Sequence, residues 1–140
     1  MQECYVADNL LYIYCMISYK KEKFINVGLL YAFMSDKSLF LEVMGDSPIN
    51  RVLDFLITFK DFDYSLTDVC GNSDVSWSTL HLFWKDLERN RIVKQTRVVG
   101  KAKMFRLDEA NPVVKELVRM HWLIAKTYTD RLFRKVEVLA

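Results

Sequence analysis

The stretch that most constrains the fold is residues 64–107, YSLTDVCGNSDVSWSTLHLFWKDLERNRIVKQTRVVGKAKMFRL. Its pattern predicts a short helix, a tight turn, a second helix, and two strands joined by a basic loop. The first helix begins after Ser65, because Asp68 three residues later completes an approximate capping box. Gly71 and Asn72 accept left-handed backbone angles at little cost, so we expect the helix to stop there.

Ser76 predicts the N-cap of the second helix, which should run from Trp77 to about Arg89. Apolar residues recur along it at i, i+4 and i+7: Leu80, Trp84 and Leu87. One such stripe indicates a helix that packs a single face on a core. The pattern fails at Asn90 and Arg91, where we expect a residue with left-handed angles.

Two strands should follow this helix. Residues 92–98 are rich in β-branched side chains and partly alternate, and residues 102–107 form the returning strand. Gly100 and Lys101 supply the turn between them. The sequence therefore predicts an α+β fold, mostly helical with a small β-hairpin.

A resemblance to a known family is carried by residues 65–117, SLTDVCGNSDVSWSTLHLFWKDLERNRIVKQTRVVGKAKMFRLDEANPVVKEL. This segment resembles the winged helix-turn-helix domain of small transcription regulators, particularly the compact kind common in archaea. The likeness runs from Pro48 to about Leu117. It makes VSWSTLHLFWKDLERNRIV the recognition helix that leads into the wing, and TRVVGKAKMFRL the basic wing hairpin. The chain departs from the family pattern where Leu82 replaces a basic residue, Arg91 replaces a Gly, and Trp77 is unusually large.

The resemblance implies that the second helix lies in the major groove of double-stranded DNA, with its N-terminal end nearest the bases. The base-facing candidates are Ser76, Trp77, Ser78, Thr79 and His81, with Lys85 nearer the backbone. Lys101 and Lys103 at the wing tip, and Arg97 across the hairpin, are placed to reach phosphates. Alternatively, Ser76 is only a cap, Trp77 only packs on the preceding turn, and the hairpin is ordinary charged surface.

Charge is unevenly distributed along the chain, although the net charge is only +2. Between residues 89 and 107 there are seven basic residues and no acid, whereas residues 36–74 hold eight acids and three basic residues. Segregation of this kind is typical of a protein with one phosphate-facing side. Six phosphate contacts would make log affinity fall with log salt at a slope of roughly −5.

The residues that serve metal and redox chemistry are few. Cys4, Cys15 and Cys70 are odd in number and lack CxxC spacing, so they predict neither a disulfide framework nor a zinc site and favour a reducing cytoplasm. His81 and His121 are the only histidines, and no metal ligand set is apparent. No nucleophile–base pair, carboxylate pair or Gly-rich phosphate loop is visible either, so we expect no enzyme and no cofactor.

Residues 1–33 are the least interpretable part of the sequence. The run LLYIYCMISY is apolar, but its ten residues are too few for a membrane helix, which needs about 20. No basic residues precede it, so a signal peptide fits poorly. The segment could form buried strands or a helical hairpin. Alternatively Met34 is the true start, because MSDKSLFLEVMGDSPINRVLDFL resembles the opening of a family member, and the domain then spans 34–110.

Helices are predicted on both sides of the central stretch. Ser47 and Pro48 form a start signal for a scaffold helix that ends near Thr58. Asn111 and Pro112 repeat that signal, and residues 111–140 should form a helix to about residue 135, roughly 36 Å long. Such a helix exceeds what the small domain needs, so we expect it to pair with its copy in a homodimer. The alternative is that it folds back over the scaffold helix.

Two functions are consistent with these observations. The first is a DNA-binding transcription regulator that acts as a homodimer in the cytoplasm, without metal, cofactor or membrane. The second is a winged-helix module that docks on other proteins, which Leu82 and Trp77 favour because exposed apolar residues can mark partner sites. Binding of RNA would use the same electrostatics as binding of DNA.

Overall fold

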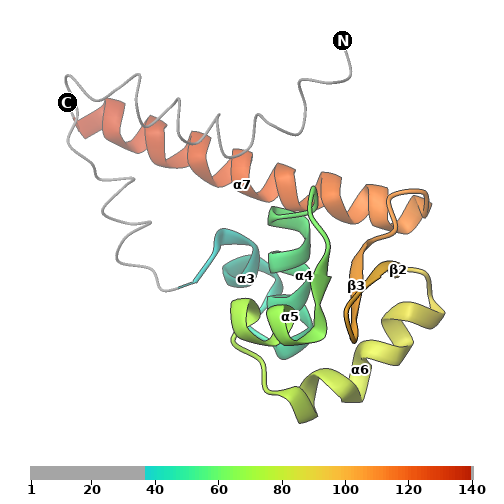
Figure 1. Cartoon of the computed structure of the whole chain (residues 1–140). Coiled ribbons are helices and arrows are strands. Elements are labelled where there is room, and N and C mark those ends of the chain that lie inside the picture. Colours follow the sequence, from blue (N-terminus) through green and yellow to red (C-terminus); the bar gives the residue numbers. More distant parts are fainter. Residues whose placement is uncertain (1–36, 140) are drawn as a thin grey trace. The chain divides into compact units, whose positions relative to one another are not determined.

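The computed structural model describes residues 37–139 (Figure 1). Its elements are α3 (Leu39–Met44), α4 (Pro48–Thr58), β1 (Tyr64–Ser65), α5 (Leu66–Ser73), α6 (Trp77–Arg89), β2 (Val93–Val99), β3 (Ala102–Leu107) and α7 (Pro112–Leu139). Helices followed by a hairpin and a long C-terminal helix make an α+β fold with winged-helix topology, as the sequence predicts. The predictions for residues 1–33 and for a start at Met34 lie outside the described residues.

Contacts within the chain divide it into two units, and residues 37–125 make up the larger one. The first half of α7 belongs to this unit, while the half from Lys126 onward belongs to the other. Helix α7 has 28 residues, which corresponds to about 42 Å, and it extends beyond the predicted end near residue 135. Within residues 37–139, no helix has the length and apolar content that crossing a membrane would require.

The helix starts predicted from serine caps are confirmed. Ser47, Ser65 and Ser76 each have extended backbone angles, and each side chain accepts a hydrogen bond from the N–H three residues later. At Ser65 the box is complete, because its own N–H donates to the Asp68 carboxylate at 3.0 Å. These bonds satisfy N–H groups that a helix start otherwise leaves without partners.

The predicted end of α5 is wrong by one turn. Gly71 and Asn72 lie inside the helix, and the left-handed residue is Asp74, with φ +53°. Side chains hold the last turn together: the Asn72 amide donates to the Asp68 carbonyl at 2.8 Å, and the Ser73 hydroxyl donates to a carbonyl of the same helix. Asp tolerates left-handed angles better than most residues do, so the turn into α6 needs no glycine.

The left-handed corner expected between α6 and β2 is present at Arg91, with φ +56°. Asn111 supports it from the start of α7. The Asn111 amide donates to the carbonyls of Asn90 at 3.1 Å and Arg91 at 2.9 Å, and its oxygen accepts from the Val113 N–H at 3.0 Å. One side chain therefore caps α7 and fixes the corner that leads into the hairpin.

Replacing Asn111 by Ala should lower the free energy of unfolding by about 1–2 kcal/mol, because a cap and two further hydrogen bonds are lost. Asn111→Asp retains the capping oxygen and loses the two donated bonds, so it should fall between the wild type and the Ala variant. Urea unfolding monitored by tryptophan fluorescence measures all three. Equal stability of the wild type and Asn111→Ala would contradict the bracing role.

The core lies where α4, α5, α6, the strands and the start of α7 meet, and it contains the predicted α6 stripe of Leu80, Trp84 and Leu87. The Trp84 ring meets the Phe105 ring of β3 edge to face, with centroids 5.3 Å apart and planes at 83°. The indole N–H of Trp84 donates to Glu88 at 2.6 Å. This aromatic contact fixes how α6 lies against the hairpin.

The strands form one antiparallel sheet in the order β1-β3-β2. Gln95 pairs with Phe105 and Arg97 pairs with Met104, so the pairing skips Thr96 and leaves a bulge in β2. The turn at Gly100 has φ +63°, as the predicted turn requires. Bulges increase the local twist of a hairpin, and this one lies near the base of the predicted wing.

The first half of α7 packs on α4. Val114 is fully buried, and His121 Nε2 donates to Asp54 of α4 at 2.7 Å while its ring lies 5.0 Å from that of Phe40. His121 interrupts the apolar stripe of the helix because it pairs with this carboxylate. This packing corresponds to the alternative in which the helix folds back on the scaffold, and pairing with a second copy remains a prediction.

Candidate nucleic-acid interface

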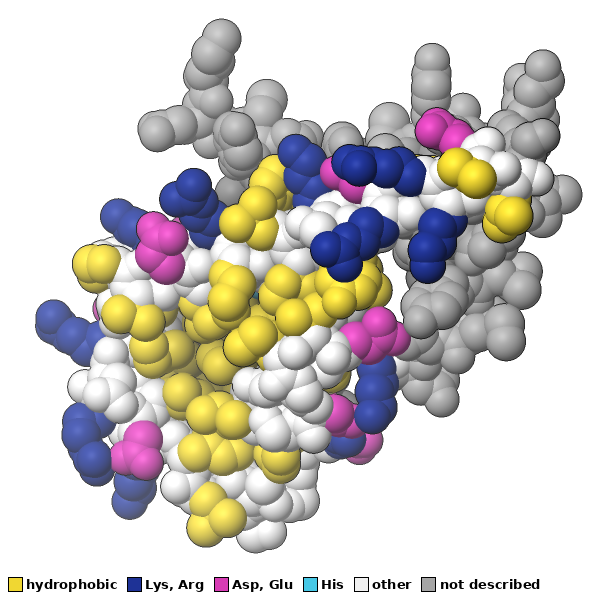
Figure 2. All heavy atoms as spheres, turned by 180° about the vertical axis from the view of Figure 1, so that it is seen from behind, with side chains coloured by type: hydrophobic (Ala, Val, Ile, Leu, Met, Phe, Trp, Pro, Cys, Tyr) yellow, Lys and Arg dark blue, Asp and Glu magenta, His cyan; other side chains and the backbone are white. Residues whose placement is uncertain are grey.

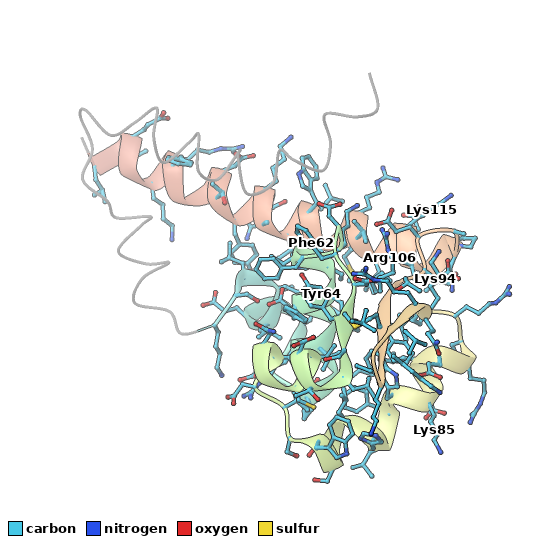
Figure 3. The ribbon with its side chains drawn as sticks, viewed as in Figure 1. Phe62, Tyr64, Lys85, Lys94, Arg106 and Lys115 are labelled. Carbon is cyan, nitrogen blue, oxygen red and sulfur yellow. The ribbon has the colours of Figure 1, made fainter. Side chains whose placement is uncertain are left out.

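The face of α6 that points away from the core carries side chains spaced at i, i+3, i+4 and i+7: Ser78, His81, Leu82 and Lys85. All four are exposed, and Leu82 is the most exposed large hydrophobic residue of the helix, at 81%. Trp77 at the start of the helix is 53% exposed. Figure 3 shows Lys85 projecting outward from α6. A helix with one outward polar stripe can present side chains to a groove.

The hydroxyl groups at the start of α6 are engaged with one another. Ser76 Oγ accepts from the Thr79 N–H at 3.3 Å and lies 2.7 Å from Thr79 Oγ1. Ser78 Oγ lies 3.3 Å from Ser76 Oγ, and the Ser78 side chain remains exposed. The capping role of Ser76 is therefore observed, and the contacts of these three residues with DNA stay predictions.

Trp77 and His81 form an aromatic pair on this helix. Their ring centroids are 4.4 Å apart, and the His81 Nδ1 group donates to the Trp77 carbonyl at 2.8 Å. The indole therefore lies against the following turn of the helix, whereas one interpretation of the sequence placed it against the preceding turn. The pair stiffens two side chains that the sequence predicts to face bases.

Four of the seven basic residues between positions 89 and 107 form ion pairs with acids. The pairs are Arg89–Asp86 at 3.0 Å, Lys94–Asp108 at 3.5 Å, Arg97–Asp63 at 2.8 Å and Arg106–Glu109 at 3.7 Å. Within residues 37–139 no ion pair involves Arg91, Lys101 or Lys103, and all three are exposed. The charge segregation seen in the sequence is therefore partly cancelled in space.

Asp63 ties the base of the hairpin together. Its Oδ2 accepts from Thr96 Oγ1 at 2.7 Å and from Arg97 Nε at 2.8 Å, and its Oδ1 accepts from Arg97 Nη2 at 3.0 Å. Asp63 precedes β1, and the residues that it binds lie at the bulge of β2, on the other side of β3. Arg97 is thus committed to a bidentate pair, and its predicted phosphate contact stays a prediction.

The Arg97 guanidinium and the Thr96 hydroxyl lower the pKa of Asp63 from its usual 3.8 to about 2. Because the folded pKa lies below the unfolded one, the stabilisation is present above about pH 4 and is lost as pH falls toward 2. Asp63→Asn should therefore lower the melting temperature at about pH 6 and have little effect near pH 2. Thermal unfolding of both proteins across this range is the measurement, and a pH-independent difference would contradict the clamp.

A second group of basic residues surrounds a hollow lined by Lys60, Glu109, Val114, Lys115 and Val118. Figure 3 labels Lys94, Arg106 and Lys115 in this region. Glu109 accepts from Lys60 Nζ at 3.1 Å and lies 3.7 Å from Arg106 Nη2. Glu109 partly neutralises the positive charge of Lys60 and Arg106, so the hollow is less suited to phosphate than the wing tip.

Cys70 lies in α5 and is partly buried. Burial raises the pKa of the Cys70 thiol, which keeps it protonated and weakly nucleophilic. Its side chain packs against the core. In the part of the chain that the structure describes, no three His, Cys, Asp or Glu side chains are grouped to hold a metal ion.

No protein-family model matches the sequence, and a search of the curated proteins also finds no match. The class of the protein is accordingly defined by its fold, an α+β domain with winged-helix topology and a long C-terminal helix.

Proposed function

We propose that this chain is a DNA-binding transcription regulator of the small archaeal winged helix-turn-helix kind. Helix α6 enters the major groove, and the β2–β3 hairpin is the wing that contacts the phosphate backbone. The observation that carries the proposal is the pair of exposed lysines at the wing tip, Lys101 and Lys103, which have no ion pair within residues 37–139. Lys101 lies in the turn and Lys103 in β3, on the same sheet that α6 packs against.

Four cations support binding to phosphates: Lys85, Arg91, Lys101 and Lys103. Each is exposed and lies on α6, at its C-terminal corner or at the wing tip. Four phosphate contacts give a log–log salt slope of roughly −3.6 per protomer, lower than the value for six contacts because the structure places acids beside Arg97 and other cations. Ser78 and His81 are the polar groups left to meet base edges.

Selection of bound sequences from random duplex DNA at physiological salt tests the function. A regulator should enrich a defined motif, and a homodimer should enrich two half-sites about one helical turn apart. Salt titration of the enriched duplex then gives the slope. Absence of duplex binding even at low salt would overturn the proposal.

A homodimer through α7 is part of the proposal. The support is the length of the helix, about 42 Å, of which only the first half belongs to the unit that contains the winged fold. Sedimentation equilibrium of the whole chain should therefore report twice the chain mass. A monomer at every concentration tested would remove the dimer from the proposal and leave DNA binding by single domains to be tested.

The second candidate is a protein-interaction module without DNA binding. The observation in its favour is the exposure of Leu82 and Trp77 on α6, together with Val98 and Val99 on the hairpin, which are 57% and 52% exposed. Figure 2 shows further hydrophobic side chains gathered in the middle of one face, with Lys and Arg side chains toward its margins. Recovery of a stable protein partner that Leu82→Arg no longer binds, with no duplex binding at low salt, would select this function.

A further inference from the structure

The hydrogen bond from His81 to the Trp77 carbonyl decides which ring nitrogen carries the proton. A carbonyl oxygen only accepts, so Nδ1, which lies 2.8 Å from it, must be the N–H donor. In a neutral imidazole the other nitrogen, Nε2, is then a hydrogen-bond acceptor. The bond is made within one helix, between residues four apart, so forming it requires no contact with DNA.

The Trp77 ring determines how this acceptor can be approached. The centroid of the indole lies 4.4 Å from that of the imidazole and the two planes are tilted by 43°, so the indole lies beside the ring. His81 is exposed, and no described residue supplies a partner for Nε2. The imidazole therefore has a free acceptor at Nε2, on the same outward stripe as Ser78 and Lys85.

We propose that His81 reads a base edge with Nε2 as acceptor, and so selects a base that carries an amino group in the major groove. This inference rests on the proposed function, because it places α6 in that groove. Cytosine offers its N4 amino group and adenine its N6 amino group, whereas guanine and thymine present only acceptors at the equivalent positions. At a guanine or thymine, Nε2 of His81 would face the acceptor oxygen or nitrogen of the base. Neither atom would then keep its hydrogen bond to water. The expected preference for cytosine or adenine is about tenfold.

The tautomer can be tested on the free protein. Long-range ¹H–¹⁵N correlation of the histidine rings should show a protonated Nδ1 and an unprotonated, pyridine-type Nε2 at His81. Trp77→Ala retains the carbonyl and should retain this tautomer. A proton on Nε2 in the wild type would overturn the inference without reference to DNA.

The base preference is tested by comparing the wild type with His81→Phe, which retains a planar ring at an exposed position and lacks the acceptor. Selection from random duplexes should give one position at which the wild type enriches adenine or cytosine and His81→Phe enriches neither. Leu82→Ala, one residue along the same exposed face, should retain that preference.

Base analogues sharpen the comparison. If adenine is enriched, purine without its 6-amino group should weaken wild-type binding about tenfold; if cytosine is enriched, 2-pyrimidinone should do the same. His81→Phe should be indifferent to the change. Identical preferences in the two proteins, with DNA binding intact, would overturn the role of His81 and leave the proposed function standing. A wild type that binds no duplex would overturn both.

Discussion

Reversing the charge of both wing-tip lysines, Lys101→Glu with Lys103→Glu, is expected to weaken duplex binding by about 100-fold or more at moderate salt. Each cation that contacts a phosphate releases counterions, so the loss of two contacts accounts for roughly half or more of the decrease in log affinity. Repulsion between the new carboxylates and the phosphates accounts for the rest. The log–log salt slope should flatten by about 2. Fluorescence anisotropy with a labelled duplex at several salt concentrations measures both quantities.

The control must change total charge equally without changing the wing. Lys115→Glu with Arg119→Glu does so in the first half of α7, at two exposed cations outside the half proposed for dimerisation. This variant should bind far more tightly than the wing-tip variant, because overall charge affects affinity only through screened, longer-range interactions. Equal losses in the two variants would mean that net charge, and not the hairpin, determines binding.

Local signals account for the parts of the fold that the sequence predicts well. Ser47, Ser65 and Ser76 make their capping bonds to N–H groups three residues away, so the sequence contains both partners side by side. The α6 stripe is equally local, because helical spacing alone places Leu80 and Trp84 on one face. The bounds of β3 and the turn at Gly100 likewise follow from local residue types, whereas β2 is shifted by one residue from the predicted strand.

Interactions between distant residues are what the sequence could not supply. Asp63 reaches Arg97 across 34 positions, and nothing near either residue indicates that they meet. The sequence therefore counts Arg97 as an unopposed cation, whereas the folded chain neutralises it and uses it to brace the hairpin. The end of α5 is a smaller case, since Asn72 and Ser73 extend the helix with their own side chains beyond Gly71.

The candidate site was predicted partly from local sequence signals and depends partly on the folded structure. Helical spacing was sufficient to place Ser78, His81 and Lys85 on an outward face, and the i, i+4 spacing of Trp77 and His81 already permitted their contact. The direction of the hydrogen bond between those two residues needed coordinates, because side-chain rotamers decide which nitrogen faces the carbonyl. Sequence thus indicates which residues are presented, and geometry indicates what each one can donate or accept.

The different burial of the two tryptophans of α6 makes a further prediction, which compares one substitution at two positions. Trp84→Ala should lower the free energy of unfolding by about 3–5 kcal/mol, because the indole is 3% exposed and its removal leaves a cavity against Phe105. That is a large part of the stability of a typical domain, so a substantial fraction of the chain should be unfolded at physiological temperature.

Trp77→Ala removes the same side chain two turns earlier, at the N-terminal end of α6, and should cost about 1 kcal/mol or less, since half of the indole already contacts water. Urea unfolding followed by far-UV circular dichroism compares the two without relying on the altered tryptophans. Similar losses would mean that Trp77 is packed in the core and that the N-terminal end of α6 is not free to enter a groove. A large difference instead supports an open N-terminal end of α6, on which the His81 experiment depends.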